Sequence, residues 1–102
     1  MATEKLDLLI LKTLALEPRH GYGIARRIEQ VSEGVFTVTL GALYPALARL
    51  DRAGAIRSRW AQSENNRRAR YYALTAAGRR RLAEEEADWK RVADAMARVL
   101  EV

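Results

Sequence analysis

The stretch that decides the fold is residues 39–75, TLGALYPALARLDRAGAIRSRWAQSENNRRARYYALT. Its first part predicts a helix that Thr39 caps and that runs to about Ala53, because Thr is a favoured N-cap residue and Gly54 follows in the usual closing position. Pro45 lies past the first turn and removes a backbone donor, so we expect a slight kink or a late start to the regular helix. One face of this helix carries Leu40, Leu43, Leu47 and Leu50.

The second part of the stretch predicts a β-hairpin. Residues 56–62 alternate, with Ile56, Ser58 and Trp60 on one face and two arginines, Arg57 and Arg59, on the other. Residues 68–74 are rich in residues that favour strands, and the polar run 63–66 between the two segments has the composition of a turn. Two such strands joined by a short polar loop form a hairpin.

Two shorter helices are predicted upstream of this stretch. The first spans Lys5–Glu17 and ends at Pro18; it is apolar nearly all round, so it needs cover on both sides, which a second subunit could provide. A turn at 19–23 leads to a second helix over Tyr22–Val31, after which residues 35–38 form a short extended segment. Four side chains of the second helix are expected to face inward: Ile24, Ala25, Ile28 and Val31.

Downstream, Thr75 can cap a long last helix over Ala76–Leu100. Leu82, Trp89 and Met96 are spaced seven apart, Val92 and Val99 occupy the alternate positions, and Glu85 is the exception. This heptad seam has no core of its own beside it, so it is typical of a helix that pairs with another copy. We therefore expect a dimerisation helix over residues 76–102 that forms one compact unit with residues 1–75.

Three helices followed by a two-stranded hairpin form the winged helix-turn-helix plan, a mainly α fold in which the third helix lies in the major groove of DNA. We therefore expect residues 1–75 to form a DNA-binding domain. The charge distribution agrees with this plan. Residues 49–81 hold ten arginines and two acidic residues, a net charge of +8, whereas residues 1–48 are neutral and residues 82–102 carry −3. A concentrated basic segment suggests a polyanionic partner, although such a segment can also be a solvated surface.

Composition argues against several other classes. The chain of 102 residues has no cysteine and one histidine, His20, so thiol chemistry and His or Cys metal sites are excluded. No nucleophile–base pair, carboxylate dyad or phosphate-binding glycine loop is present, so we expect neither an enzyme nor a cofactor. The absence of a long apolar run argues against a membrane span, and the lack of a signal-peptide pattern over residues 1–16 predicts a cytoplasmic protein.

Four blocks of sequence carry a more specific signal: HGYGI at 20–24, LYPALARL at 43–50, GAI at 54–56 and RRARYYALTAAG at 67–78. In this order and spacing, over residues 6–82, they resemble the PadR family of transcriptional regulators, and the single last helix is similar to the compact subfamily. The resemblance implies a homodimeric transcriptional repressor that binds double-stranded DNA. It also implies that the last helix, and often the first, lies in the dimer interface.

By position, the resemblance and the charge pattern give two sets of candidate residues. The DNA-binding set is Thr39, Gly41, Ala42, Tyr44, Arg49, Arg67, Arg68 and Arg70. The dimer-interface set is Leu8, Leu11, Leu82, Trp89, Val92, Met96 and Val99. Many family members have Thr or Ser where this chain has Ala42, which removes a hydroxyl that could bind a phosphate or a base edge.

Several of these residues have a plainer interpretation as well. His20 is expected to be a structural turn residue, and Tyr44 could be a packed aromatic instead of a contact to the DNA backbone. Trp89 could be core shared across the dimer, whereas in some compact relatives a tryptophan at this place lines a pore that accepts flat aromatic compounds. The alternative to a DNA-binding regulator is a winged-helix module whose basic face meets an acidic protein.

Overall fold

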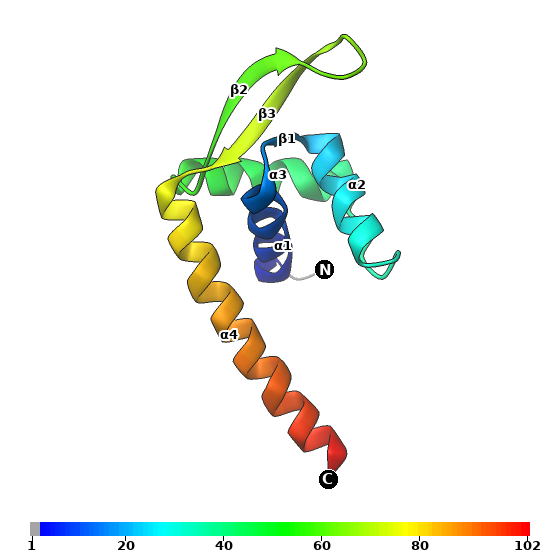
Figure 1. Ribbon diagram of the computed structural model, residues 1–102, viewed down its shortest axis with the longest axis vertical. Helices are drawn as coiled ribbons and strands as arrows, with labels where there is room; N and C mark the ends of the chain where they lie inside the picture. Colours follow the sequence, from blue (N-terminus) through cyan, green and yellow to red (C-terminus); the bar gives the residue numbers. More distant parts are fainter. Residues whose placement is uncertain (1–2) are drawn as a thin grey trace.

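The computed structural model describes residues 3–102, so residues 1 and 2 of the expected first domain lie outside the described part. The helices are α1 (Thr3–Leu16), α2 (Gly21–Val31), α3 (Leu40–Arg52) and α4 (Ala76–Glu101), and the strands are β1 (Arg19–His20), β2 (Ile56–Gln62) and β3 (Arg68–Leu74). This order confirms the predicted winged helix-turn-helix plan. In Figure 1 the β2–β3 hairpin projects from one end of the helical domain, whereas α4 begins near the base of the hairpin and extends past the opposite end of the domain.

The core lies where α1 meets α2, α3 and the base of the hairpin. Its largest fully buried side chains come from all four parts and are Ile10, Leu11, Leu14, Ile24, Leu43, Leu47, Leu50 and Ile56. Each such side chain contributes about 1.5–3 kcal/mol relative to an exposed one. Because α1 contacts α2, α3, α4 and β3, it is the central element of the domain.

A third strand joins the hairpin, in the order β1-β3-β2. Arg19 and His20 pair antiparallel with Tyr72 and Tyr71, so the prediction of a turn over residues 19–23 was wrong: the segment is a two-residue strand that passes directly into α2. His20 also caps α2, since its Nδ1 accepts a hydrogen bond from the backbone N–H of Gly23 at 3.0 Å. The expected structural role of His20 is therefore confirmed.

Three further local predictions need correction. Val31 is 64% exposed and does not face the core, because it is the last residue of α2, beyond the buried positions Ile24, Ala25 and Ile28. Leu40 is exposed, so three leucines and not four form the inner face of α3. That helix begins at Leu40 without a late start and continues through Pro45. The carbonyl that Pro45 leaves without a partner belongs to Gly41, which is exposed to water.

The start of α4 packs against the loop that follows α3 and is hydrogen-bonded to it. As predicted, Thr75 caps the helix: its Oγ1 accepts from the N–H of Gly78 at 3.0 Å and donates to the Gly54 carbonyl at 2.6 Å. Gly78 lies so close to this loop that a Cβ there would be 2.0 Å from the Ala55 carbonyl oxygen. Gly41, in the first turn of α3, differs from Gly78, because a Cβ on Gly41 would meet only Thr39 Oγ1, at 3.9 Å.

Gly78→Ala should therefore lower the free energy of unfolding by about 1–3 kcal/mol or more, the usual cost of overpacking against a group that cannot move. The matched variant Gly41→Ala should raise it by up to about 1 kcal/mol, because alanine favours a helix interior and the site is open. Urea denaturation at one protein concentration measures both. Equal effects of the two substitutions would contradict the contact described for Gly78.

Candidate nucleic-acid interface

The exposed face of α3 is small and uncharged at its amino end. Thr39 caps the helix, with its Oγ1 accepting from the N–H of Ala42 at 3.2 Å. Gly41 and Ala42 follow, both exposed, and Tyr44 is 47% exposed one turn further on. Because short side chains cover little of the backbone, this end of α3 can approach another surface closely.

A hollow of about 540 Å³ lies between this end of α3, the start of α2 and the hairpin. Its walls include the phenol rings of Tyr22 and Tyr44 and the arginines Arg67, Arg68 and Arg70. A Cβ on Gly21 would lie 2.8 Å from the Tyr44 hydroxyl oxygen, so the glycine leaves room for that ring. Tyr44 thus packs against Gly21 at its hydroxyl end and is 47% exposed, and its contact with the DNA backbone stays a prediction.

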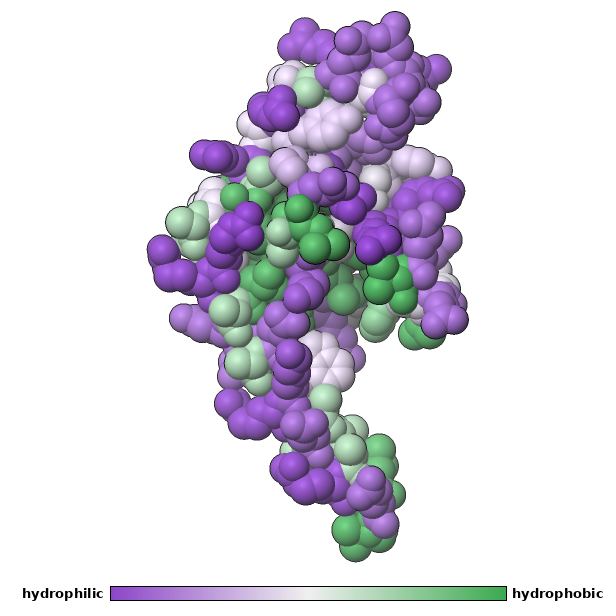
Figure 2. Space-filling model, viewed as in Figure 1, coloured by the Kyte–Doolittle hydropathy of each residue, from purple (hydrophilic) through white to green (hydrophobic). Residues whose placement is uncertain are grey.

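The strand register places Arg68 and Arg70 on the same face of the β2–β3 hairpin, which is the wing of this fold. Trp60 lies opposite Arg70 and Gln62 lies opposite Arg68, and opposite residues of antiparallel strands share a face. Arg70 Nε donates to Ser58 Oγ at 2.8 Å, and the Arg68 guanidinium lies 5.5 Å from the centre of the Trp60 ring. The hairpin at the top of Figure 2 is mostly hydrophilic.

Trp60 is a member of this surface that the sequence analysis did not single out. It is 57% exposed and lines the hollow beside the arginines. The strict alternation of residues 56–62 was the available signal, because it places Trp60 on the same face as Ile56 and Ser58. An indole on that face, with a guanidinium above it, holds the arginine in a defined orientation.

One acidic side chain interrupts the basic wing. Glu64, in the turn between the strands, lies 3.4 Å from His20 Nε2 through its Oε1. A hydrogen bond from its own backbone N–H, and then the His20 ring, hold the pKa of the Glu64 carboxyl below its usual value. The contact ties the wing tip back to β1 across the sheet.

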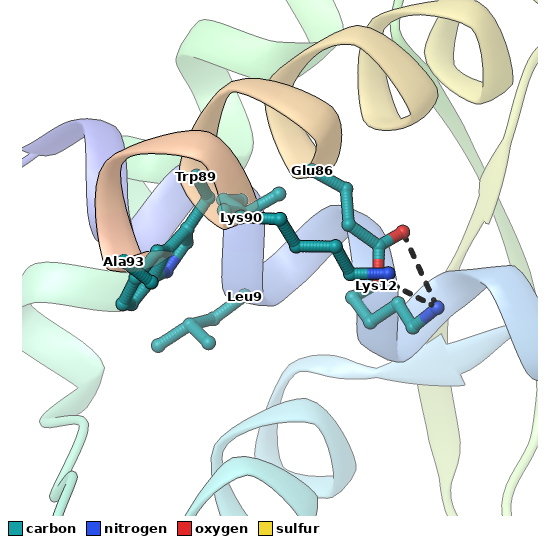
Figure 3. Close-up of a pocket in the computed structure, with 7 residues that line it drawn as sticks. Leu9, Lys12, Glu86, Trp89, Lys90 and Ala93 are labelled. Atoms are coloured by element: carbon teal, nitrogen blue, oxygen red, sulfur yellow. Dashed lines mark hydrogen bonds and ion pairs between the residues drawn. The ribbon is translucent and has the colours of Figure 1, made fainter. Parts of the chain in front are cut away.

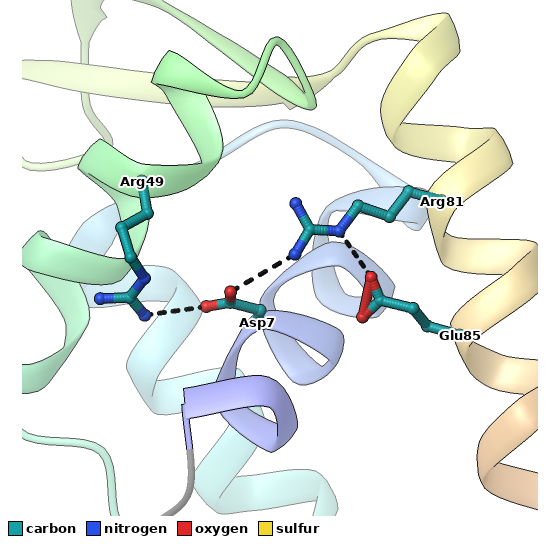
Figure 4. A network of polar contacts seen from close by, with 4 residues as sticks. All are labelled: Asp7, Arg49, Arg81 and Glu85. Atoms are coloured by element: carbon teal, nitrogen blue, oxygen red, sulfur yellow. Dashed lines mark hydrogen bonds and ion pairs between the residues drawn. The ribbon is translucent and has the colours of Figure 1, made fainter.

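Arg49 is placed differently from the other predicted DNA-binding residues. Its Nη2 donates to Asp7 Oδ1 at 3.0 Å, so its guanidinium points to α1 and does not line the hollow (Figure 4). Asp7 also accepts from Arg81 of α4, at 3.5 Å, and Arg81 Nε donates to Glu85 at 2.5 Å. The sequence analysis missed this network; its signal was a carboxylate within a helix that is otherwise apolar nearly all round.

The predicted dimer-interface residues divide into two groups. Leu11 is fully buried and Leu82 is 8% exposed, so both pack within this chain and leave little or no side-chain surface for a second subunit. On the outer face of α4, by contrast, four apolar side chains are about half exposed or more: Trp89, Val92, Met96 and Val99. Leu8 is partly buried and lies near Trp89.

A second hollow, of about 350 Å³, lies between α1 and α4 (Figure 3). Leu8, Leu9, Trp89 and Ala93 form its apolar wall. At its edge Lys12 of α1 forms an ion pair with Glu86 of α4, with a closest approach of 3.3 Å. Among residues 3–102 the structure offers no group of three acidic or histidine side chains that could hold a metal ion. Within the same range no helix is long and apolar enough to span a membrane.

The fold and this surface are those of a winged-helix DNA-binding regulator of transcription. Residues 10–84 match the model of the Transcriptional regulator PadR-like family, and the chain belongs to that family. The chain is similar to a PadR family transcription regulator from Clostridium difficile R20291, with 31% identity, a TM-score of 0.80, and coverage of 93% of this chain and 97% of that one.

Two other comparisons agree with this assignment. A PadR family regulator from Eggerthella lenta is 30% identical, with a TM-score of 0.78 and coverage of 96% of this chain and 83% of that one. An uncharacterised 37.1 kDa protein in transposon Tn4556 of Streptomyces fradiae is 41% identical over 85 residues, which are 83% of this chain and 23% of that protein. The chain therefore spans less than a quarter of the length of this relative.

If the wing arginines contact phosphate, as predicted, replacing Arg68 or Arg70 with Gln should weaken binding to every duplex DNA, whatever its sequence. Each change should also reduce the slope of log K against log salt by about 1. Fluorescence anisotropy at several salt concentrations measures both effects. The control Arg91→Gln removes the same charge from α4, far along the chain from the wing; an equal loss there would mean that only net charge matters.

Proposed function

We propose that this chain is a homodimeric repressor that pairs through α4, within residues 76–102, and binds a two-fold or near two-fold operator. The observation that supports it best is the apolar stripe of α4, formed by Trp89, Val92, Met96 and Val99 and exposed in the single chain. The spacing of these side chains is that of a helix seam. Burying such a stripe against its own copy removes apolar surface from water.

The shape of the molecule fits this arrangement. The chain measures 54 × 29 × 22 Å along its principal axes, and α4 runs beyond the compact domain (Figure 1). In Figure 2 the far end of this helix carries a hydrophobic surface. Leu8 and Leu9 of α1 line the hollow beside Trp89, so α1 would contribute to the same interface.

The mechanism follows from the placement of α3 and the wing. The exposed amino half of α3, with Thr39, Gly41, Ala42 and Tyr44, would enter the major groove, and the wing arginines would contact the flanking phosphates. Two subunits would then occupy half-sites about one helical turn apart, roughly 34 Å. A dimer bound in this way at a promoter would block polymerase, which makes the regulator a repressor.

A flat aromatic ligand is proposed to release the repressor from DNA. The hollow beside Trp89 has an apolar wall, and a second subunit seated on the α4 stripe would cover its open side. A planar compound stacked on the indole would then lie between the subunits. The ligand would change the separation of the two recognition helices, which are the α3 helices of the two subunits. The ligand site and the DNA-binding surface would thereby be coupled, so ligand binding would change operator affinity.

Met96→Glu should convert the dimer to a monomer and abolish specific operator binding, because it places a charge in the centre of the seam. The control Ala87→Glu adds the same charge at an exposed position on another face of α4 and should leave the dimer intact. Sedimentation velocity at equal concentrations reports the assembly state. A monomeric unmodified protein, or a Met96→Glu variant that remains dimeric, would overturn the proposed interface.

The ligand hypothesis predicts that flat aromatic compounds quench Trp89 fluorescence and weaken operator binding at the same concentrations. Trp60 must first be replaced with Phe, so that the emission comes from Trp89 alone. The matched variant Trp89→Phe, which retains Trp60, should show no quenching. If no compound in a broad panel quenches Trp89, this chain has no aromatic effector at that site.

A further inference from the structure

Among the described side chains of α1, Asp7 alone forms ion pairs with both α3, the proposed recognition helix, and α4, the proposed dimerisation helix. We propose that it is a positioning residue for DNA binding: through Arg49 of α3 and Arg81 of α4 it fixes the angle between these helices. In the dimer, that angle sets the separation of the two recognition helices. The proposal rests on the proposed homodimer.

Asp7 is a buried carboxylate that contacts two other helices. Asp7 is 6% exposed, and each of its two oxygens accepts from a different helix, Oδ1 from Arg49 and Oδ2 from Arg81 (Figure 4). A buried carboxylate is costly unless it is paired, so both arginines are needed where they are. Arg49 Nε is itself buried without a hydrogen-bond partner, so Asp7 is the group that holds this guanidinium in its place.

A second contact explains why the Asp7 network can set an angle. Gly78 holds the first turn of α4 against the Ala55 carbonyl, directly after α3. Thr75 Oγ1 also donates to the Gly54 carbonyl, so the first turn of α4 is held at one end, about which the rest of the helix could tilt. Arg81 lies almost one turn beyond Gly78 and donates to Asp7 of α1. This contact acts together with the packing of Leu82 and the Lys12–Glu86 ion pair, but among the three it alone connects α4, through Asp7, to a charged group of α3.

The length of α4 would amplify a small tilt. With a rise of about 1.5 Å per residue, the part of α4 from Arg81 to Val99 is roughly 27 Å long, so a tilt of about 5° moves its far end by roughly 2 Å. The partner subunit is proposed to sit on that part of the helix. The recognition helices of the two subunits would therefore move relative to each other and fit their half-sites less well.

The family resemblance implies a competing role for Arg49, namely direct contact with DNA, and the two roles predict opposite effects of Asp7→Asn. If Arg49 contacts DNA, its release from Asp7 and the gain of one positive charge should strengthen operator binding. If Asp7 positions α3, specific binding should weaken, because two guanidinium groups lose the negative charge between them. Binding to a scrambled duplex should strengthen slightly in both cases.

The experiment measures operator and scrambled-duplex affinities of the full chain by fluorescence anisotropy. We expect Asp7→Asn to lower the ratio of the two affinities about five-fold or more, within the usual range of coupling between sites. Arg81→Gln, which keeps the Asp7–Arg49 pair, should cause a similar loss. The double variant should be little worse than either single one, since both break one network. An unchanged or increased ratio in both single variants overturns the proposal.

The control is Lys12→Met, which breaks the other ion pair between α1 and α4 without affecting α3. It should leave the ratio of affinities unchanged; a loss equal to that of Asp7→Asn would mean that any loosening of α4 suffices, and would contradict a specific role for Asp7. Circular dichroism of each variant at the assay temperature excludes unfolding as the cause of a loss.

A distance measurement separates this proposal from the proposed dimer. The chain has no cysteine, so Ala42→Cys introduces one spin-label site on each recognition helix. The spin-labelled Ala42→Cys protein, with no other change, should give one intersubunit distance. Adding Asp7→Asn should shift or broaden this distance, and adding Lys12→Met should leave it unchanged. A dimer whose distance is the same with and without Asp7→Asn contradicts the positioning role. The absence of any intersubunit distance contradicts the dimer itself.

Discussion

The packing of α1 at the centre of the domain is the constraint on which the rest of the structure depends. Ile10 and Leu11 of α1 are fully buried, and α2, α3, β3 and α4 all contact this helix. An element surrounded in this way has no freedom to move alone. The orientation of the α3 face that is proposed to meet DNA, and the direction in which α4 leaves the domain, consequently both depend on α1. Asp7 adds directional contacts to this apolar packing, because its two oxygens accept hydrogen bonds, one from Arg49 of α3 and one from Arg81 of α4.

Outside this core, the amino end of α3 and the wing differ in charge. The amino end of α3 carries short, uncharged side chains, so the backbone can approach a base edge or phosphate, whereas positive charge is concentrated on the wing. Phosphate contacts orient a protein on the duplex and base contacts supply specificity. A replacement on the wing should thus affect all DNA sequences alike, and a replacement at the start of α3 should affect particular sequences.

The sequence predicted those elements whose periodicity is long enough to stand out. The strand limits at Ile56–Gln62 and Arg68–Leu74 agree with the structure, as do the start of α4 after Thr75 and the inner face of α3 at Leu43, Leu47 and Leu50. The two-residue strand β1 was missed, because so short a segment has no period and forms only by pairing with β3.

The site was predicted less completely than the fold. A count of arginines locates a basic segment but does not tell where each side chain points, and Arg49 points to Asp7 and not into the hollow. Similarly, a heptad pattern cannot distinguish a seam residue that packs within its own chain, such as Leu82, from one that is exposed, such as Met96. Both distinctions depend on tertiary contacts between α1 and the helices around it.

The measurement that tests the central claim most directly is fluorescence anisotropy of the unmodified protein with the DNA upstream of its own gene and with a scrambled duplex, at two salt concentrations. A sequence-specific dimeric regulator of that gene should bind the first tightly and the second weakly, with the weaker binding steeply sensitive to salt. Failure to bind either duplex at low salt would contradict the account of the α3 and wing surface as a DNA interface.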